Sequence, residues 1–166
     1  MHYYDLYESP HGRMLLVANA EGISGVYFDG QKYLPRVGPK WLRDERHAPL
    51  RQAKRELAEY FGGKRERFET ALAPEGTPFQ RSVWKAISTV GFGKTITYAD
   101  LARRAGSPGS ARAAGAATGR NPISIIVPCH RIVGSDGSLT GYAGGLDRKR
   151  ALLALESGIP DLLAAA

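Results

Sequence analysis

The chain has 166 residues, 43% of them hydrophobic, which is enough for one ordinary globular domain or two small ones. Its single cysteine excludes an internal disulfide and fits a reducing cytoplasm, and its four scattered histidines and short apolar runs predict neither a metal site nor a membrane span. Residues 77–166 carry 11 Lys/Arg against 5 Asp/Glu, and thus most of the net charge of +7, which favours a nucleic-acid partner or, alternatively, serves solubility alone.

Three strands are expected at the start of the chain, joined by tight turns. Each either alternates polar and apolar residues or reads as extended, and Glu21-Gly22 provides a hairpin turn before the third. The expected strands cover residues 3–8, 12–18 and 23–28. This part of the chain therefore predicts a small β-sheet.

One helix is expected after these strands, over Pro49–Phe61. A proline near its start, apolar residues at helical spacing and Gly62-Gly63 after its end all favour it. Residues 29–48, with prolines, glycines and mixed charges, are expected to form a surface loop. A last strand is expected over Phe68–Leu72.

The pattern of the chain changes at residues 74–78. This segment is rich in turn-forming residues, and helical spacing replaces strand alternation after it. We therefore expect an N-terminal domain over 1–73, a linker over 74–78 and a C-terminal domain over 79–166. The predicted fold class is α+β, a small sheet-and-helix domain followed by a mostly helical one.

The second domain is expected to begin with three helices. The first covers Pro78–Val90, with Thr77 as its N-cap. Two shorter helices follow. Thr97 can cap the first, Thr97–Gly106, and Gly106 can end it; Ser110 caps the second, Ala111–Gly119. Two helices around a glycine-containing turn are typical of a DNA-binding helix-turn-helix, although many such pairs only pack together.

A strand, a loop and a helix are expected to complete the chain. Asn121-Pro122 ends the preceding helix, because a residue before proline avoids the helical region, and a strand over Ile123–Val127 follows. A loop rich in glycine covers residues 134–145. The last helix runs from Asp147, as N-cap, to Ser157, with Gly158 after its end.

Cys129 is the candidate nucleophile. A thiolate is the reactive form of cysteine, and the adjacent His130 and Arg131 offer a base and a positive charge. Neighbours on a strand point to opposite sides, so the backbone must be irregular if His130 is to act on Cys129. Glu156, an acid on an otherwise apolar helix face, is a candidate to orient the histidine. The alternative is a buried unreactive thiol and a solvated Glu156, which the flanking residues make the weaker interpretation.

The run Val127-Pro128-Cys129-His130-Arg131-Ile132 resembles the active-site signature of the O6-alkylguanine-DNA alkyltransferases, the methylated-DNA–protein-cysteine methyltransferases. Further segments match that family in its order over most of residues 77–158. These segments are Phe79–Trp84, Gly93–Thr95, Thr97–Ala102, Ala111–Ala113, Asn121-Pro122 and Gly141–Gly145. The N-terminal part resembles the family only in its size and strand-helix layout.

The resemblance implies direct-reversal DNA repair by a protein with a ribonuclease H-like N-terminal domain and a helix-turn-helix C-terminal domain. Cys129 would take the alkyl (methyl) group from O6-alkylguanine, and from O4-alkylthymine, in double-stranded DNA. The transfer would be irreversible, so each molecule would act once. The protein is itself the acceptor, so no cofactor is implied. We expect a monomer, and leave open whether it assembles cooperatively on DNA.

The resemblance also implies a role for each of five candidate catalytic residues. His130 would deprotonate Cys129 through a water, and Glu156 would orient the imidazole. Tyr98 would donate to the flipped-out guanine. Asn121 would hold the turn that precedes the cysteine.

The same resemblance places DNA along the helix Ala111–Gly119. This helix would enter the minor groove, and Arg112 would fill the stack that the flipped base leaves. The candidate DNA contacts are Arg112, Tyr98, Lys94, Ala111, Ala113 and Gly115. The candidate pocket residues are Tyr142, Ala143, Gly144, Ile132 and Lys149, and no metal ligand is implied.

Two positions depart from the residues found in some relatives. Ala143 replaces a serine that can bond the alkylated oxygen, and Ser124 replaces a proline of the pocket, so the range of alkyl groups stays open.

Two other functions are alternatives to alkyl transfer. A helix-turn-helix regulator or lesion sensor would bind DNA without needing Cys129. A cysteine hydrolase would use Cys129, His130 and Glu156 but leaves the basic half unexplained.

Overall fold

The computed structural model describes residues 1–158, so the last part of the expected second domain, residues 159–166, lies outside the described residues. The chain forms two compact units. The first contains residues 1–75 together with 122–124, and the second contains residues 76–121 and those from 125 onward. The boundary after Glu75 falls within the segment expected as linker, and residues 122–124 return to the first unit.

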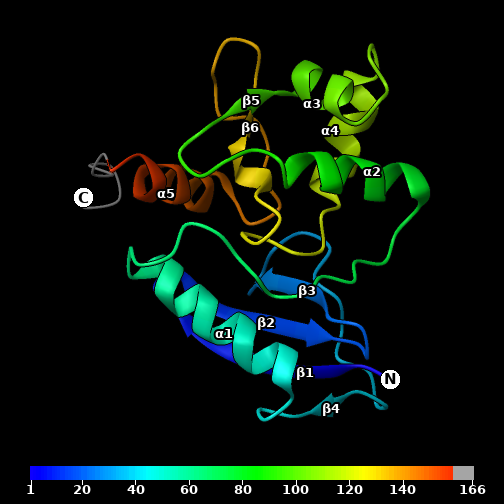
Figure 1. Ribbon diagram of the computed structural model, residues 1–166, viewed down its shortest axis with the longest axis vertical. Helices are drawn as coiled ribbons and strands as arrows, with labels where there is room; N and C mark the ends of the chain where they lie inside the picture. Colours follow the sequence, from blue (N-terminus) through cyan, green and yellow to red (C-terminus); the bar gives the residue numbers. More distant parts are fainter. Residues whose placement is uncertain (159–166) are drawn as a thin grey trace. The chain divides into compact units, whose positions relative to one another are not determined.

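The first unit is built on a four-stranded sheet in the order β3-β2-β1-β4 (Figure 1). Strands β1 (Tyr3–Ser9), β2 (Gly12–Ala18) and β3 (Ile23–Phe28) are antiparallel and lie where the sequence predicts them. Strand β4 (Leu42–Arg43) pairs parallel to β1 within the expected surface loop. Two residues are too short to show alternation, so this edge strand was not predicted.

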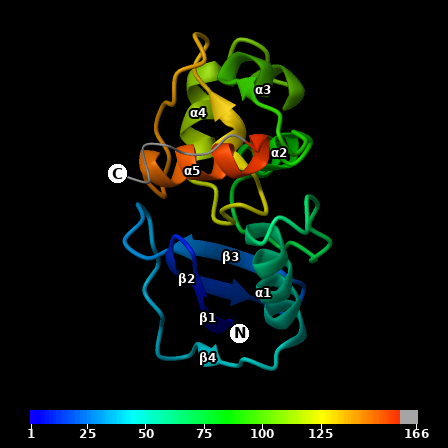
Figure 2. The same cartoon turned by 90° about the vertical axis from the view of Figure 1, so that its left-hand side faces the viewer.

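Helix α1 (Ala48–Phe61) packs against this sheet, as both views show (Figures 1 and 2). It begins one residue before the predicted helix, and Gly62 follows its end. Its buried side chains recur at helical spacing, so the apolar stripe expected from the sequence faces the sheet. They are Leu50, Ala53, Glu56, Leu57 and Tyr60.

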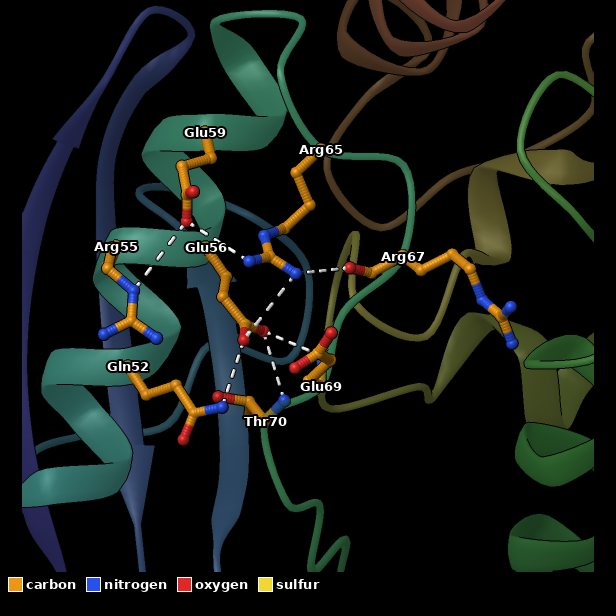
Figure 3. A network of polar contacts seen from close by, with 8 residues as sticks. All are labelled: Gln52, Arg55, Glu56, Glu59, Arg65, Arg67, Glu69 and Thr70. Atoms are coloured by element: carbon orange, nitrogen blue, oxygen red, sulfur yellow. Dashed lines mark hydrogen bonds and ion pairs between the residues drawn. The ribbon is translucent and has the colours of Figure 1, made fainter.

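The prediction of a strand over Phe68–Leu72 is wrong, and the buried carboxylate of Glu56 supplies the reason (Figure 3). Glu56 Oε1 accepts hydrogen bonds from the backbone N–H groups of Glu69, at 2.9 Å, and Thr70, at 3.1 Å. Gln52 donates to the other carboxylate oxygen at 3.0 Å. The backbone donors that a strand would use for its ladder are thus bound to a side chain, and only Leu72 forms a single bridge to Ile23.

The expected strand over Ile123–Val127 is also wrong. Ile123 forms one bridge to Val26, and Ser124 N donates to Val26 O at 3.0 Å. The chain then turns, because Ile125 takes a left-handed backbone with φ of 71°. A β-branched residue rarely adopts that conformation, so the alternation of apolar residues gave no sign of the turn.

The second unit contains three packed helices, α2 (Pro78–Ile87), α3 (Tyr98–Arg104) and α4 (Ala111–Gly119), which lie together in both views (Figures 1 and 2). A short strand, β5 (Ile96–Thr97), precedes α3. The indole of Trp84 donates to Ala117 O at 2.8 Å and so joins α2 to α4. A Cβ at Gly76 would lie 2.4 Å from the Trp84 ring, so only glycine fits there.

Three further elements complete the second unit. They are the 3-10 turn η1 (Cys129–Arg131), strand β6 (Ile132–Val133) and helix α5 (Leu146–Ser157). Strand β6 pairs parallel to β5. None of the helices within residues 1–158 has the length and apolar character needed to cross a bilayer.

The helix ends show which predicted caps form. Thr77 accepts from Gln80 N in a capping box, and Thr97 accepts from Asp100 N. The prediction of Ser110 as a capping side chain is wrong, because it forms no cap hydrogen bond. The prediction of Asp147 as N-cap is wrong as well, because α5 begins one residue earlier, after Gly145 with φ of 93°.

Candidate active site

Two elements of the second unit hold the groups around Cys129. The turn η1 carries Cys129, His130 and Arg131, and α5 packs against it and supplies Lys149 and Glu156. All five side chains are buried. The 3-10 turn is the irregular backbone that the sequence required if adjacent residues were to share one site.

Glu156 binds two neighbours of the cysteine. His130 Nε2 lies 2.6 Å from Glu156 Oε2. Arg131 donates from Nε to Oε1 at 2.7 Å and from Nη2 to Oε2 at 2.9 Å. Its third nitrogen, Nη1, donates to Val90 O at 2.6 Å. From the sequence, Arg131 was expected only as a positive charge near Cys129, and its bidentate ion pair with Glu156 was not predicted. An arginine in the same site as an acid on an apolar helix face could have indicated this pair.

The pair with Glu156 fixes the tautomer of His130. A carboxylate held by an arginine only accepts hydrogen bonds, so the proton of the neutral imidazole sits on Nε2. The other nitrogen, Nδ1, is buried and has no hydrogen-bond partner among residues 1–158. Burial lowers the pKa of His130, although Glu156 opposes this, so the imidazole is neutral and Nδ1 offers a lone pair.

Cys129 is 5% exposed, and burial raises the pKa of its thiol. The Asn121 side chain, the positive charge of Lys149 and the Tyr142 hydroxyl act in the opposite direction. Asn121 also donates from Nδ2 to Val127 O at 2.9 Å, which closes the turn before the cysteine. The thiol is therefore protonated at rest, with partners in place that favour the thiolate.

Lys149 is fully buried beneath the loop that follows β6. Its Nζ donates to Ile132 O at 2.6 Å and to Thr140 O at 3.2 Å. Burial lowers its pKa to about 8, while Cys129 acts to raise it. Near neutral pH the lysine thus remains cationic and stabilises negative charge on Cys129.

Tyr98 begins α3 and is half-buried. Its hydroxyl accepts a hydrogen bond from Thr140 Oγ1 at 2.9 Å. A Cβ added to Gly115 of α4 would lie 3.6 Å from the Tyr98 ring. Thr140 is a contact that the sequence did not indicate, since 42 residues separate the two side chains.

The remaining candidate residues divide into surface and interior. Those exposed to solvent are Lys94, Arg112 and Ala113. Those of intermediate exposure are Ala111, Gly115, Tyr142 and Ala143, and Gly144 and Ile132 are buried. Within residues 1–158, no group of three or more His, Cys, Asp or Glu is arranged to hold a metal ion.

Both parts of the chain match models of one known protein family. Residues 2–74 match the ribonuclease-like domain of 6-O-methylguanine DNA methyltransferase, and residues 78–158 match its DNA-binding domain. The chain belongs to the 6-O-methylguanine DNA methyltransferase family. The α+β fold and the family predicted from the sequence are thus confirmed.

Individual members of the methyltransferase family are similar over almost the whole chain. The methylated-DNA–protein-cysteine methyltransferase of Methanosarcina barkeri is 49% identical, covering 93% of this chain and 96% of the relative. The protein of that name from Haemophilus influenzae is 43% identical, covering 93% and 86%. The crystal structure of Mycobacterium tuberculosis OGT in complex with DNA has a TM-score of 0.87 at 40% identity and 97% coverage of both chains.

Proposed function

We propose that this protein repairs double-stranded DNA by transferring an alkyl group from O6-alkylguanine to Cys129. The observation that carries the proposal is the buried Glu156 that binds both His130 and Arg131, the two residues that follow Cys129, in a member of the methyltransferase family. The protein acts as a methylated-DNA–protein-cysteine methyltransferase. O4-alkylthymine is the second substrate that we propose.

The transfer is a single displacement. His130 Nδ1 takes the thiol proton of Cys129 through a water, and Glu156 stabilises the imidazolium that forms. The thiolate attacks the alkyl carbon, the carbon–O6 bond breaks, and its electron pair remains on guanine. Tyr98 donates a proton toward N3 of the purine, which makes guanine a better leaving group. The thioether product is stable, so each molecule acts once, and no cofactor takes part.

The exposed part of α4 is the DNA-binding surface in this proposal. Helix α4 enters the minor groove, where Ala111, Ala113 and Gly115 allow close approach with little reading of sequence. The lesion leaves the duplex for the site, because its O6 group cannot be reached inside the base stack. Arg112 fills the vacated stack, and Lys94 contacts a phosphate.

The loop before α5 forms the pocket for the flipped base. Tyr142, Ala143 and Gly144 wall it, Ile132 lies at its base, and Lys149 supports the loop from beneath. We further propose that the chemistry resides in a C-terminal domain, 79–166, that a linker at 74–78 joins to domain 1–73. The protein acts as a cytoplasmic monomer.

The test is the intact mass of the protein after incubation with duplex DNA that contains O6-methylguanine. We expect a gain of one methyl group, mapped by digestion to the peptide that holds Cys129, and none in Cys129→Ser. DNA binding without any mass gain would instead indicate a lesion sensor. Repeated turnover of an ester substrate would indicate a cysteine hydrolase.

A further inference from the structure

The hydroxyl of Tyr98 has a neighbour to which the proposed mechanism gives no role. Thr140 Oγ1 donates a hydrogen bond to the Tyr98 hydroxyl at 2.9 Å. Both side chains are of intermediate exposure, so they lie at the border between the interior and the surface. A base that enters the site from outside would meet this pair.

The backbone of the second unit brings the two residues together. Strands β5 and β6 are parallel, with Ile96 opposite Ile132 and Thr97 opposite Val133. Tyr98 follows β5 directly, and the loop that contains Thr140 follows β6. Parallel strands end at the same edge of a sheet, so the tyrosine and the loop leave that edge side by side.

Thr140 is anchored by its own backbone. Lys149 Nζ donates to Thr140 O at 3.2 Å and to Ile132 O at 2.6 Å, which ties the loop to β6. The Tyr98 ring also lies near α4, where a Cβ added to Gly115 would be 3.6 Å from it. The phenol hydroxyl is therefore bonded to a loop residue that is itself anchored.

We propose that Thr140 is a positioning residue for Tyr98 during alkyl transfer, an inference that rests on the proposed function. Because Thr140 donates, it occupies a lone pair of the phenol oxygen and leaves the phenol proton for the purine. As the carbon–O6 bond breaks and negative charge moves onto the purine, that proton shifts toward N3. The hydrogen bond from Thr140 then stabilises the charge that develops on the phenol oxygen.

The first test compares Thr140→Val with Thr140→Ser in a single-turnover assay on duplex DNA containing O6-methylguanine. The valine variant keeps the size of the side chain but loses the donor, so we expect transfer to slow about two- to tenfold, the effect of one hydrogen bond. The serine variant restores the donor and the rate. Ser138→Ala, which removes an exposed hydroxyl of the same loop, serves as control and keeps the wild-type rate.

The second test asks whether Thr140 acts through Tyr98. In a Tyr98→Phe background there is no phenol oxygen to accept, so Thr140→Val should cause no further loss. Equal slowing in both backgrounds, or a serine variant as slow as valine, would overturn the role of Thr140. Thr140→Ala replaces the valine variant if that fails to fold. Absence of any methyl transfer by the wild-type protein would instead overturn the proposed function.

Discussion

Glu156 stabilises the whole row of groups beside Cys129, because one buried carboxylate binds both His130 and Arg131. A buried charge is costly unless it is paired and hydrogen-bonded, and here every oxygen of the carboxylate has a partner. The guanidinium in turn reaches Val90 O, so the pair is fixed to the turn that follows α2. The orientation of the imidazole therefore depends on a residue that need not touch the substrate.

Arg131→Met should be strongly destabilising. It leaves the Glu156 carboxylate buried without its ion pair, and breaking a buried pair in this way costs about 3–5 kcal/mol. The pKa of His130 should also rise, since the positive charge of Arg131 helps to lower it. Urea denaturation measures the first effect, and the pH dependence of the transfer rate measures the second.

The matched control for this change is Arg150→Met on the same helix as Glu156. Arg150 pairs with Asp147, whose side chain is 94% exposed, so this ion pair is a surface pair. Such pairs contribute about 0–1 kcal/mol. Similar losses in the Arg131 and Arg150 variants would contradict the importance of the buried pair.

In the protein without DNA, the thiol of Cys129 should lose its proton only at a pH above the ordinary range for cysteine. Burial raises its pKa above the ordinary value of 9.0. The rate of modification by iodoacetamide should therefore keep rising above pH 9, because only the thiolate reacts. In Lys149→Met the rate near pH 7 should fall, because Lys149, with a pKa of about 8, is cationic there and stabilises the thiolate. Above pH 9 the lysine is already largely neutral, so its loss should change the rate little.

Digestion and mass spectrometry at each pH would follow this reaction at Cys129. The urea-unfolded chain is the control, and its profile should centre on the ordinary thiol value. A native profile that levels off below pH 8.5 would show that the partners of the thiol outweigh its burial.

At the site, the sequence indicated which residues to expect but not the contacts that they form. Cys129, His130 and Glu156 stand out by residue type and by the apolar face around the acid. The double contact of Arg131 and the bond from Thr140 to Tyr98 depend on a 3-10 turn and on strand pairing. Neither of these has a local pattern in the chain.

At the scale of the element, two helix N-caps can be compared directly, because Thr77 forms a cap hydrogen bond and Ser110 does not. Thr77→Ala should lower the free energy of unfolding by about 1 kcal/mol, because it removes the side chain that accepts from Gln80 N at 3.1 Å. Ser110→Ala is the matched control, because Ser110 forms no cap hydrogen bond. Its effect should stay within about 0.5 kcal/mol. Urea denaturation of both variants decides the point, and equal losses would contradict the capping assignment.

The elements also show where sequence patterns fail. Strands β1 to β3 and helix α1 bury regular apolar patterns, so their positions could be predicted. The segments over Phe68–Leu72 and Ile123–Val127 have the same composition as strands. In the first, Glu56 takes the backbone donors, and in the second, Ile125 reverses the chain. Both effects come from tertiary structure, which overrides local propensity.

At the scale of the whole molecule, the excess of positive charge is the feature that bears on DNA. Residues 1–76 carry 12 Lys/Arg and 11 Asp/Glu, whereas residues 77–166 carry 11 and 5. The basic part of the chain thus coincides with the part that carries α4 and Cys129. Binding to phosphates releases counterions, so affinity should fall steeply as salt is added.

The salt dependence of duplex binding can therefore locate the DNA-binding surface. If the exposed Lys94 contacts a phosphate, Lys94→Ala should reduce the slope of log affinity against log salt by about one. Arg51→Ala removes an exposed cation from α1 of the first unit and should leave the slope unchanged. Fluorescence anisotropy with an undamaged duplex measures both, so that alkyl transfer does not contribute. Each phosphate contact that is lost should release about one counterion fewer and so lower the slope. If the slope fell in Arg51→Ala and stayed unchanged in Lys94→Ala, the DNA-binding surface would lie on the first unit.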